Sequence, residues 1–333
     1  MAHDLATVNG QTAMIFYGEA PWHGLGKKLD KPATAAEAIQ AARLDWEVGK
    51  MPLFFNHRKR YRPIPDRFAI VRKDQTAGAA PPTVLGIVGE DYTPLQNVEA
   101  FKWFDPIVGE GAAIYHTAGA LGRGERVWIL AKLPDDIRVI GDDIAEKYLL
   151  LSNSHDGSSS VQVKFTPIRV VCQNTLTMAL SQGRSLRIAH TPSLPARMAA
   201  ARESLGIIRE RFAEIEAAFQ RMAGVPVNHE RLAQYVDRVF PLPADDHDER
   251  ARARVRRARN ESAWLFEGGR GNAAPKVRGT LWAAYNGVAE FVDYAVTHRD
   301  RSHRLDAVWF GHGYLSKVRA YRLALTCAEA WKN

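Results

Sequence analysis

Short apolar runs alternate with clusters of Gly, Pro and charged residues through the front of the chain, which is the pattern of β-strands joined by turns. The runs that predict strands are WEVGKMPLFF (46–55), RFAIVRK (67–73), TVLGIVG (83–89), AAIYHTAGAL (112–121), RVWILAKL (126–133), KYLLLSNS (147–154) and VQVKF (161–165). Between 112–121 and 126–133, Gly122 and Gly124 can supply the positive φ of a hairpin turn. We therefore expect an antiparallel sheet.

Helical spacing appears in two front segments and dominates the back of the chain. Thr34 and Glu37 have the spacing of a capping box and open a predicted helix at 34–44, and residues 95–108 also have helical spacing. After residue 194 the apolar residues recur three and four positions apart, first at Leu205, Ile208, Phe212, Ile215 and Phe219, and then within 228–240, 247–266, 279–297 and 311–331. These segments predict helices.

The two patterns together predict an α+β protein, with a strand-rich N-terminal and central part containing an antiparallel sheet and a helical C-terminal part. We expect an α+β sheet domain with basic strands at 1–194 and a helical region at 195–333. Two prolines within 191–199 favour an extended linker there.

Composition describes a globular chain in a reducing compartment. The 333 residues are 46% hydrophobic, which is ample for a core. No apolar run reaches the roughly 18 residues of a membrane span, and the first residues lack the features of a signal peptide. The two cysteines, Cys172 and Cys327, are too far apart in sequence to suggest a disulfide framework. We expect a cytoplasmic protein with no membrane association.

Catalytic residue types are concentrated in NSHDGSSSVQVKFTPIRVVCQNTL (153–176). Cys172 stands at a predicted strand-to-helix junction that Asn174 would cap, but a strand separates it by roughly 30 Å from His155, the local candidate base. We expect a structural Cys172, no catalytic residue, no cofactor and no metal site. The alternative is an enzyme, either a Cys172-dependent hydrolase or a metal-dependent nuclease built from scattered residues such as His298, His303 and His312.

Charge gives the stronger signal, because the chain has a formal net charge of +8. Residues 57–73 carry seven cations against Asp66 alone, with Tyr61 among them. Residues 157–202 contain no Asp or Glu, where average composition would place about five. Cations on strands with interleaved aromatic side chains suit a groove for single-stranded nucleic acid, although Lys and Arg also protect solvated edge strands.

The expected ligand is single-stranded DNA or RNA, held along a basic groove on the sheet. The residues expected to contact phosphates or stack on bases are Arg58, Lys59, Arg60, Tyr61, Arg62, Lys164, Phe165, Arg169, Arg184 and Arg187. A third basic run, 247–260, has acids before its arginines, an order that the helix macrodipole favours. We expect this run to be a solvated helix.

Four motifs carry a resemblance to a known family: WHGLG (22–26), DGSSSVQVKFTPIRVVCQNTL (156–176), GTLWAAYNGVAEFVDY (279–294) and FGHGYLSKVRAYRLAL (310–325). They resemble the phage/plasmid-like protein family, a domain-of-unknown-function family of phages, prophages and plasmids. The resemblance implies a bacterial host cytoplasm and supplies no catalytic residues. The predicted order of three strands and a helix in 113–181 is similar to the core of single-strand annealing proteins of DNA recombination, which form homo-oligomers.

Overall fold

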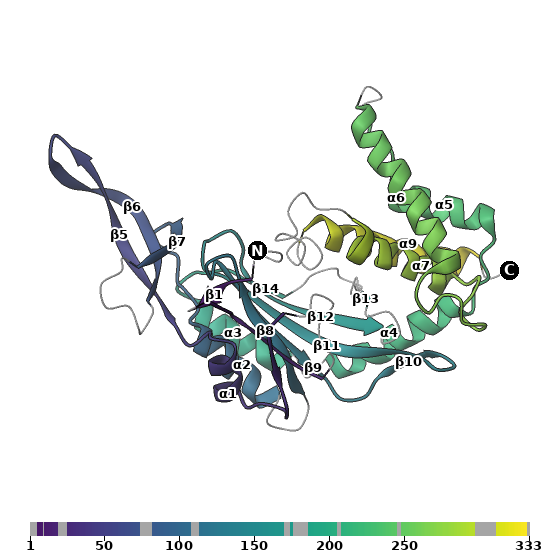
Figure 1. Cartoon of the computed structure of the whole chain (residues 1–333), viewed down its shortest axis with the longest axis horizontal. Helices are drawn as coiled ribbons and strands as arrows, with labels where there is room; N and C mark the ends of the chain where they lie inside the picture. The colour runs from purple at the N-terminus through teal and green to yellow at the C-terminus, as the bar shows by residue number, and fades with distance from the viewer. Residues whose placement is uncertain are drawn as a thin grey trace. The chain divides into compact units, whose positions relative to one another are not determined.

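The computed structural model of the chain is an α+β structure in which mainly antiparallel strands precede a helical C-terminal part, as the sequence predicts (Figure 1). It describes residues 5–8, 10–18, 25–73, 82–107, 113–169, 174–175, 186–204, 208–244, 248–296 and 311–331. The chain forms two compact units. Unit 1 comprises Met1–Pro134, Tyr148–Lys164 and Ser185–Gly206, and unit 2 comprises Asp135–Lys147, Phe165–Arg184 and Ile207–Asn333.

Among the described residues, nine strands form the main sheet. Its path runs β13 (Asn174–Thr175), β12 (Val161–Arg169), β11 (Asp143–Ser154), β9 (Arg126–Lys132), β8 (Ile114–Leu121), β3 (Met14–Tyr17) and β4 (Lys27–Leu29), with β10 (Ile137–Ile140) on β11 and β14 (Leu186–Ile188) on β12. The predicted β8–β9 hairpin is confirmed, with φ of 65° at Gly122 and 117° at Gly124. Strands β3 and β4 pair in parallel.

Two smaller sheets complete the strands. A two-stranded sheet joins β1 (Thr7–Val8) to β2 (Gln11–Thr12). A three-stranded antiparallel sheet has the order β5 (Glu47–His57), β6 (Arg60–Lys73) and β7 (Thr83–Val88). The predicted strands at 46–55, 67–73 and 83–89 therefore form a sheet of their own.

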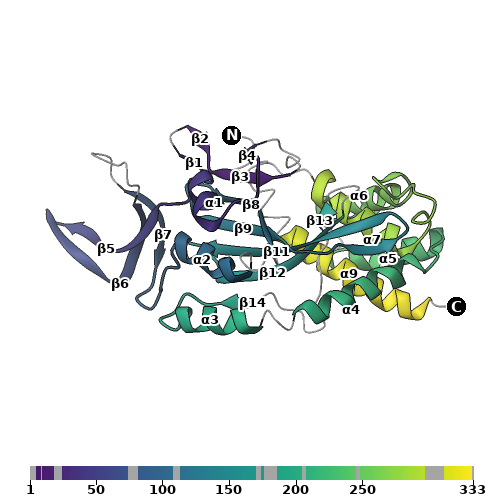
Figure 2. The same cartoon turned by 90° about the horizontal axis from the view of Figure 1, so that it is seen from below.

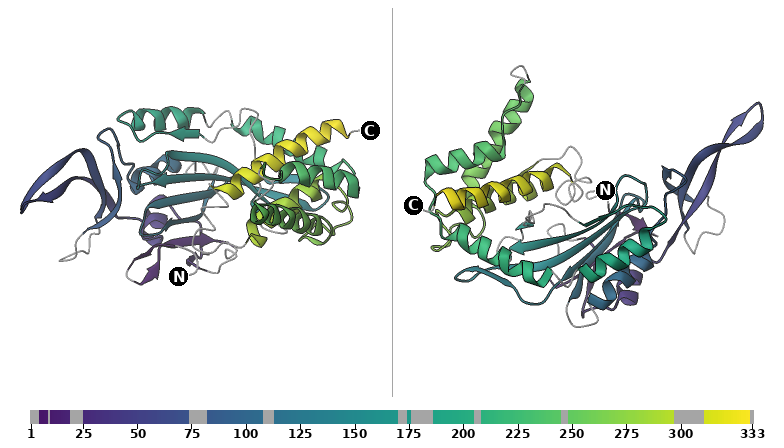
Figure 3. Two further views of the ribbon diagram at one scale, coloured as in Figure 1. Left: turned by 90° about the horizontal axis from the view of Figure 1, so that it is seen from above. Right: turned by 180° about the vertical axis from the view of Figure 1, so that it is seen from behind.

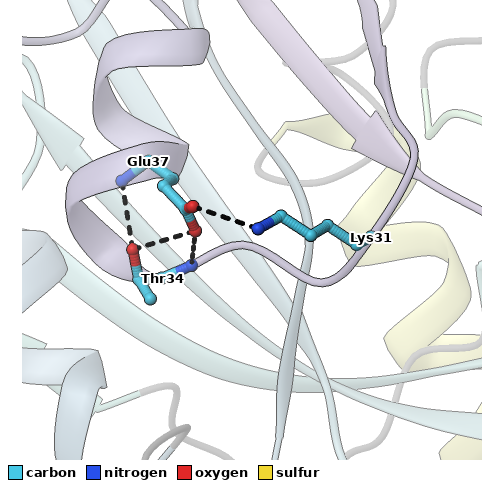
Figure 4. Close-up of polar contacts among 3 residues, drawn as sticks. All are labelled: Lys31, Thr34 and Glu37. Atoms are coloured by element: carbon cyan, nitrogen blue, oxygen red, sulfur yellow. Dashed lines mark hydrogen bonds and ion pairs between the residues drawn. The ribbon is translucent and has the colours of Figure 1, made fainter.

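Helices α1 (Ala35–Ala41), α2 (Asn97–Ile107) and α3 (Leu194–Ser204) belong to unit 1 (Figure 2). The predicted capping box of α1 is confirmed, since the Thr34 hydroxyl accepts from the Glu37 amide at 3.3 Å and the Glu37 carboxylate accepts from the Thr34 amide at 2.9 Å. Lys31 lies 3.6 Å from the same carboxylate (Figure 4). These hydrogen bonds lower the pKa of Glu37.

The extended linker predicted at 191–199 is wrong from residue 194 onward, because α3 begins at Leu194. Pro195 falls in the first turn, where a helix needs no donated amide and the fixed φ of proline is already helical. The indole nitrogen of Trp103 in α2 donates to the Met198 carbonyl in α3 at 2.7 Å, so this hydrogen bond joins the two helices.

Unit 2 contains α4 (Ile208–Ala223), α5 (His229–Val239), α6 (Glu249–Gly268), α7 (Leu281–Glu290), the π-helical turn η3 (Phe291–Ala295) and α9 (His312–Ala330). Figure 3 shows the C-terminal helices, in green and yellow, from two further sides. Every residue of α7 is buried, so α7 is the central helix of the unit. Its Trp282 donates from the indole nitrogen to Asp143 at 2.7 Å. Lys317 and Asp293 form a buried ion pair at 2.7 Å.

Each compact unit is built from several stretches of the chain, and the division at residue 194 stays a prediction. Strands β11 and β12 each contribute residues to both units, so the chain passes between the units several times. The sequence predicts a helix after Cys172, but Asn174–Thr175 form strand β13, which pairs with Ile168 and Arg169 of β12. Cys172 itself and residues 176–181 lie outside the described residues.

Candidate nucleic-acid interface

Strands β5 and β6 extend beyond their three-stranded sheet as a two-stranded ribbon (Figure 1). We call residues 51–67 the arm. Every residue of the arm is exposed except Leu53, which is partly exposed. The base of the same sheet differs, since Ala69, Ile70 and Val71 are buried. Because both of its faces meet solvent, the arm adds little to the core of unit 1.

A bulge lies within the arm, close to the base of the sheet. Pro52 pairs with Phe68, and the next pair is Phe54 with Pro63. One residue on β5 therefore stands opposite four on β6, and among these Asp66 has a φ of 55°. Bulges of this kind bend a ribbon and redirect its side chains.

The tip of the arm is a two-residue turn formed by Arg58 and Lys59. Their φ values are 49° and 62°. Two left-handed residues between paired strands are typical of a type I′ turn, which favours Asn and Gly. A residue with a Cβ costs on the order of 1 kcal/mol there. The two cations at the tip therefore occupy positions where the backbone conformation disfavours any residue with a Cβ.

The arm has two chemically distinct faces. Opposite residues of an antiparallel pair point to the same face, and neighbours along a strand alternate. By the observed register, the basic face carries Phe55, His57, Arg60 and Arg62, and the aromatic face carries Phe54, Asn56, Tyr61 and Pro63. Tyr61 is 76% exposed and Phe54 is 54% exposed. Exposed aromatic rings beside cations are typical of a binding surface.

The arm's cations are available to a ligand. Within the described residues, the side chains of Arg58, Lys59, Arg60 and Arg62 make no ion pair or hydrogen bond. Arg72, from the same basic run, is structural instead. Its guanidinium lies 4.5 Å from the Trp46 ring centroid and donates to the Arg123 carbonyl at 2.8 Å.

The other predicted site residues, from Lys164 to Arg187, do not extend the arm. Strands β12 and β14 belong to the main sheet, whereas β6 belongs to the three-stranded sheet. Lys164 is 6% exposed, so its side chain is not presented to a polyanion. Phe165 is partly exposed, and Arg187 on β14 is exposed. Arg169 ends β12, but its side chain lies outside the description, as does Arg184 altogether. The described strands therefore do not form the predicted continuous groove on one sheet.

A second polar region of unit 1 is buried except at Tyr92, which is partly exposed. We call Tyr92, Asn97, Asn153, His155 and His190 the His155 cluster. His155 is fully buried, and its Nε2–H donates to Oδ1 of Asn97 at 3.0 Å. The Asn97 amide donates to the Leu44 and Trp46 carbonyls at 3.0 and 3.4 Å. His155 lies in the connection between β11 and β12, where the sequence predicts a turn, and its side chain is nevertheless buried in the core.

Burial controls the ionisation of this cluster. Burial first and the charge of His190 second lower the pKa of His155 to about 3, and the charge of Asp156 opposes the shift. Burial also lowers the pKa of His190, which stacks on Tyr92 at 4.6 Å and contacts the Thr93 carbonyl through Nδ1 at 3.0 Å. The Tyr92 hydroxyl donates to the Ser154 carbonyl at 2.7 Å. These contacts join the start of α2 to the end of β11 and describe a structural network.

Only some of the residues named for the enzyme alternative lie in the described part of the chain. No group of three or more His, Cys, Asp or Glu among the described residues could hold a metal ion. His312 begins α9, whereas His298 and His303 lie outside the description. Cys327 is buried, and burial raises the pKa of its thiol, which disfavours a nucleophile. In the described part of the chain, no helix is long and apolar enough to cross a bilayer.

Comparison with known proteins gives one finding. No curated protein and no solved structure matches the chain. A family model described as a domain of unknown function, DUF932, matches residues 84–309. The match includes Asn97, His155 and α6 and leaves out the arm. Since it spans more than half of the 333 residues, this chain belongs to the DUF932 family.

Proposed function

We propose that this chain binds single-stranded nucleic acid and that the arm is its contact surface. One observation carries the proposal: an exposed two-stranded ribbon carries cations that have no partner among the described residues, and its aromatic face carries a Tyr61 ring that is 76% exposed. Across the arm there are five Lys or Arg against the single carboxylate of Asp66. Such a surface neutralises phosphates and offers rings to unpaired bases.

The aromatic face favours a single strand over a duplex. Unpaired bases expose their faces for stacking, and stacking is tolerant of sequence. Base pairs inside a duplex do not expose those faces. A second candidate is duplex binding, because a two-stranded ribbon fits the major groove of B-form DNA. The contribution of Tyr61 and Phe54 separates the two candidates, since only a single strand can stack on both.

A protein of phages, prophages or plasmids that acts in the bacterial cytoplasm would use such an arm to hold strands for annealing during DNA recombination. Annealing needs no bond chemistry, so it requires no catalytic group. Homo-oligomers would place several arms along one strand. Whether the strand is DNA or RNA is decided by comparing both in the assay below.

The test is a fluorescence-anisotropy titration of a labelled single-stranded oligonucleotide at several salt concentrations. Each phosphate contact contributes about 0.7 to the slope of log K against log salt for a single strand. Combined Arg58→Ala, Arg60→Ala and Arg62→Ala should therefore flatten the slope by about two units. Alanine keeps the left-handed strain at position 58, so the triple variant changes charge and leaves the turn geometry comparable.

The matched control removes the same charge from arginines that already have partners. Arg252, Arg256 and Arg259 of α6 make ion pairs with Glu249 or Asp237. Their combined replacement by Ala should leave the slope nearly unchanged. An unchanged slope in the arm variant, or no binding by the wild type at low salt, contradicts the proposal. Tighter binding of a duplex, unaffected by Tyr61→Ala, would favour the major-groove candidate.

A further inference from the structure

Helix α6 carries six arginines that divide into two sets. At about 100° per residue, Arg252, Arg256 and Arg259 fall within about 60° of one another on one side of the helix. By the same geometry, Arg250, Arg254 and Arg257 fall within about 60° of one another on the opposite side, and Trp264 lies on that side as well. The buried residues Ala258, Ser262, Leu265 and Phe266 lie between the two sets.

The macrodipole does not explain these arginines, contrary to the expectation from sequence. Helix α6 continues to Gly268 and has no basic residue in its last turn. The arginines occupy its first half, nearer the positive end of the dipole, and the dipole acts only over the first and last turns. Their roles must therefore come from their contacts.

The first set is engaged within the protein. Arg259 lies 2.9 Å from the Asp237 carboxylate and donates to the Phe240 carbonyl at 2.9 Å. Arg252 and Arg256 both pair with Glu249. These three arginines tie the N-terminal half of α6 to itself and to the end of α5.

The second set differs, and we call Arg250, Arg254, Arg257 and Trp264 the α6 flank. Among the described residues, Arg250 and Arg254 make no ion pair or side-chain hydrogen bond, and Arg257 makes one contact, with the Ala295 carbonyl at 3.5 Å. All three are exposed, and Trp264 is 66% exposed. Like charges at this spacing repel, so the helix alone gains nothing from them. Glu261 is the one carboxylate on this side.

We infer that the α6 flank is a second binding surface for single-stranded nucleic acid, separate from the arm. This inference takes its ligand class from the proposed function and needs no contribution from the arm. Arg250, Arg254 and Arg257 supply a row of cations for consecutive phosphates, and Trp264 supplies a ring for a base. A membrane surface suits the flank less well, because Trp264 is its only large apolar side chain and interfacial helices carry a broad apolar face.

Unit 2 offers matched variants for the test, because its two arginine sets lie in one helix and carry equal charge. Titrations use the full chain and a labelled oligothymidylate at several salt concentrations. Combined Arg250→Ala, Arg254→Ala and Arg257→Ala should flatten the slope of log K against log salt by up to about two units. Combined Arg252→Ala, Arg256→Ala and Arg259→Ala should change it much less. Thermal unfolding of both variants confirms that each is folded.

Trp264 tests the ligand class. Trp264→Ala should weaken binding of the oligonucleotide roughly tenfold with the slope unchanged, whereas Trp264→Phe should retain most of the affinity. Equal binding of poly-glutamate of the same charge, with no loss in Trp264→Ala, would overturn the assignment to nucleic acid and indicate an acidic protein partner.

The arm variant separates this inference from the proposed function. If the arm triple variant flattens the slope and the α6 flank variant does not, the inference is overturned and the arm remains the site. If only the flank variant flattens it, the inference holds and the arm is not the contact surface. Equal effects in the two α6 variants would show a general charge effect and overturn the inference.

Discussion

The arm and the His155 cluster are both rich in polar side chains of unit 1, and they use them in opposite ways. In the cluster, buried amides and rings hydrogen-bond to neighbouring segments, as Asn97 does with His155 and two backbone carbonyls. In the arm, exposed cations have no side-chain partner among the described residues, and aromatic rings meet solvent. Polar groups that stabilise a fold are engaged with the protein, while polar groups that bind a ligand are left available to it.

The largest expected effect is in the cluster. Asn97→Ala removes two donated hydrogen bonds and leaves the His155 Nε2–H without its acceptor, all in a buried site. We expect a loss of about 3 kcal/mol in the free energy of unfolding, measured by urea denaturation. Asn56→Ala on the arm is the control and should change stability by less than about 0.5 kcal/mol. Similar losses in the free energy of unfolding of both variants would contradict the proposed difference between the His155 cluster and the arm.

The pH dependence of stability follows from the lowered pKa of His155. The ordinary pKa of histidine is 6.5, and the folded value is about 3, so the unfolded chain binds an extra proton between these values. The stabilisation is complete above pH 6.5 and decreases as the pH falls toward 3. The loss approaches about 1.4 kcal/mol per pH unit for one group. His190 and Asp156 titrate beside His155 and shape the curve.

Urea denaturation between pH 8 and pH 4.5 measures this dependence. His155→Gln provides the comparison, because glutamine keeps a donor and does not titrate. If the wild type and a folded His155→Gln variant lost stability equally over this range, the buried imidazole would not be the responsible group.

The contrast between these regions also shows what the sequence could reveal. Predictions from the sequence are confirmed where the structure depends on residues that are close together in the chain. The capping box of Thr34 and Glu37 and the hairpin glycines at 122 and 124 were predicted from spacing alone, and they are confirmed. Each depends on residues within one turn of one another, so no distant contact can alter it.

The prediction was weaker where burial depends on distant segments. Lys164 reads as a phosphate contact because it is charged, yet it is buried in the sheet. Phe54 and Phe55 read as ordinary strand residues and are exposed on the arm. A strand pattern does not tell which strand will lack a covering layer, and that is decided by tertiary packing. The run of cations from Arg58 to Arg62 was the available signal for the arm.

Tyr61 tests the aromatic face directly. Tyr61→Ala should weaken binding of a single strand by about 1–2 kcal/mol, roughly tenfold, through the loss of stacking. The salt dependence should stay the same, because no charge is removed. Tyr61→Phe retains the ring and should bind nearly as well as the wild type. If Tyr61→Phe lost as much affinity as Tyr61→Ala, a hydrogen bond from the hydroxyl would replace stacking as the contact.

The smallest expected effect on stability concerns the strained tip of the arm. Arg58→Asn with Lys59→Gly supplies the residues that a type I′ turn favours, so it should stabilise the arm by about 1 kcal/mol. The same change removes two cations and should flatten the salt slope by about 1.4 units if both contact phosphate. Hydrogen exchange of the arm's backbone amides reports the local stability, and anisotropy titration reports binding. Arg58→Ala with Lys59→Ala removes the charges and keeps the strain, so it should flatten the slope without slowing exchange. A variant that gains stability and keeps full binding would show that the tip cations do not contact the ligand, and the strain at residues 58 and 59 would then have no role in binding.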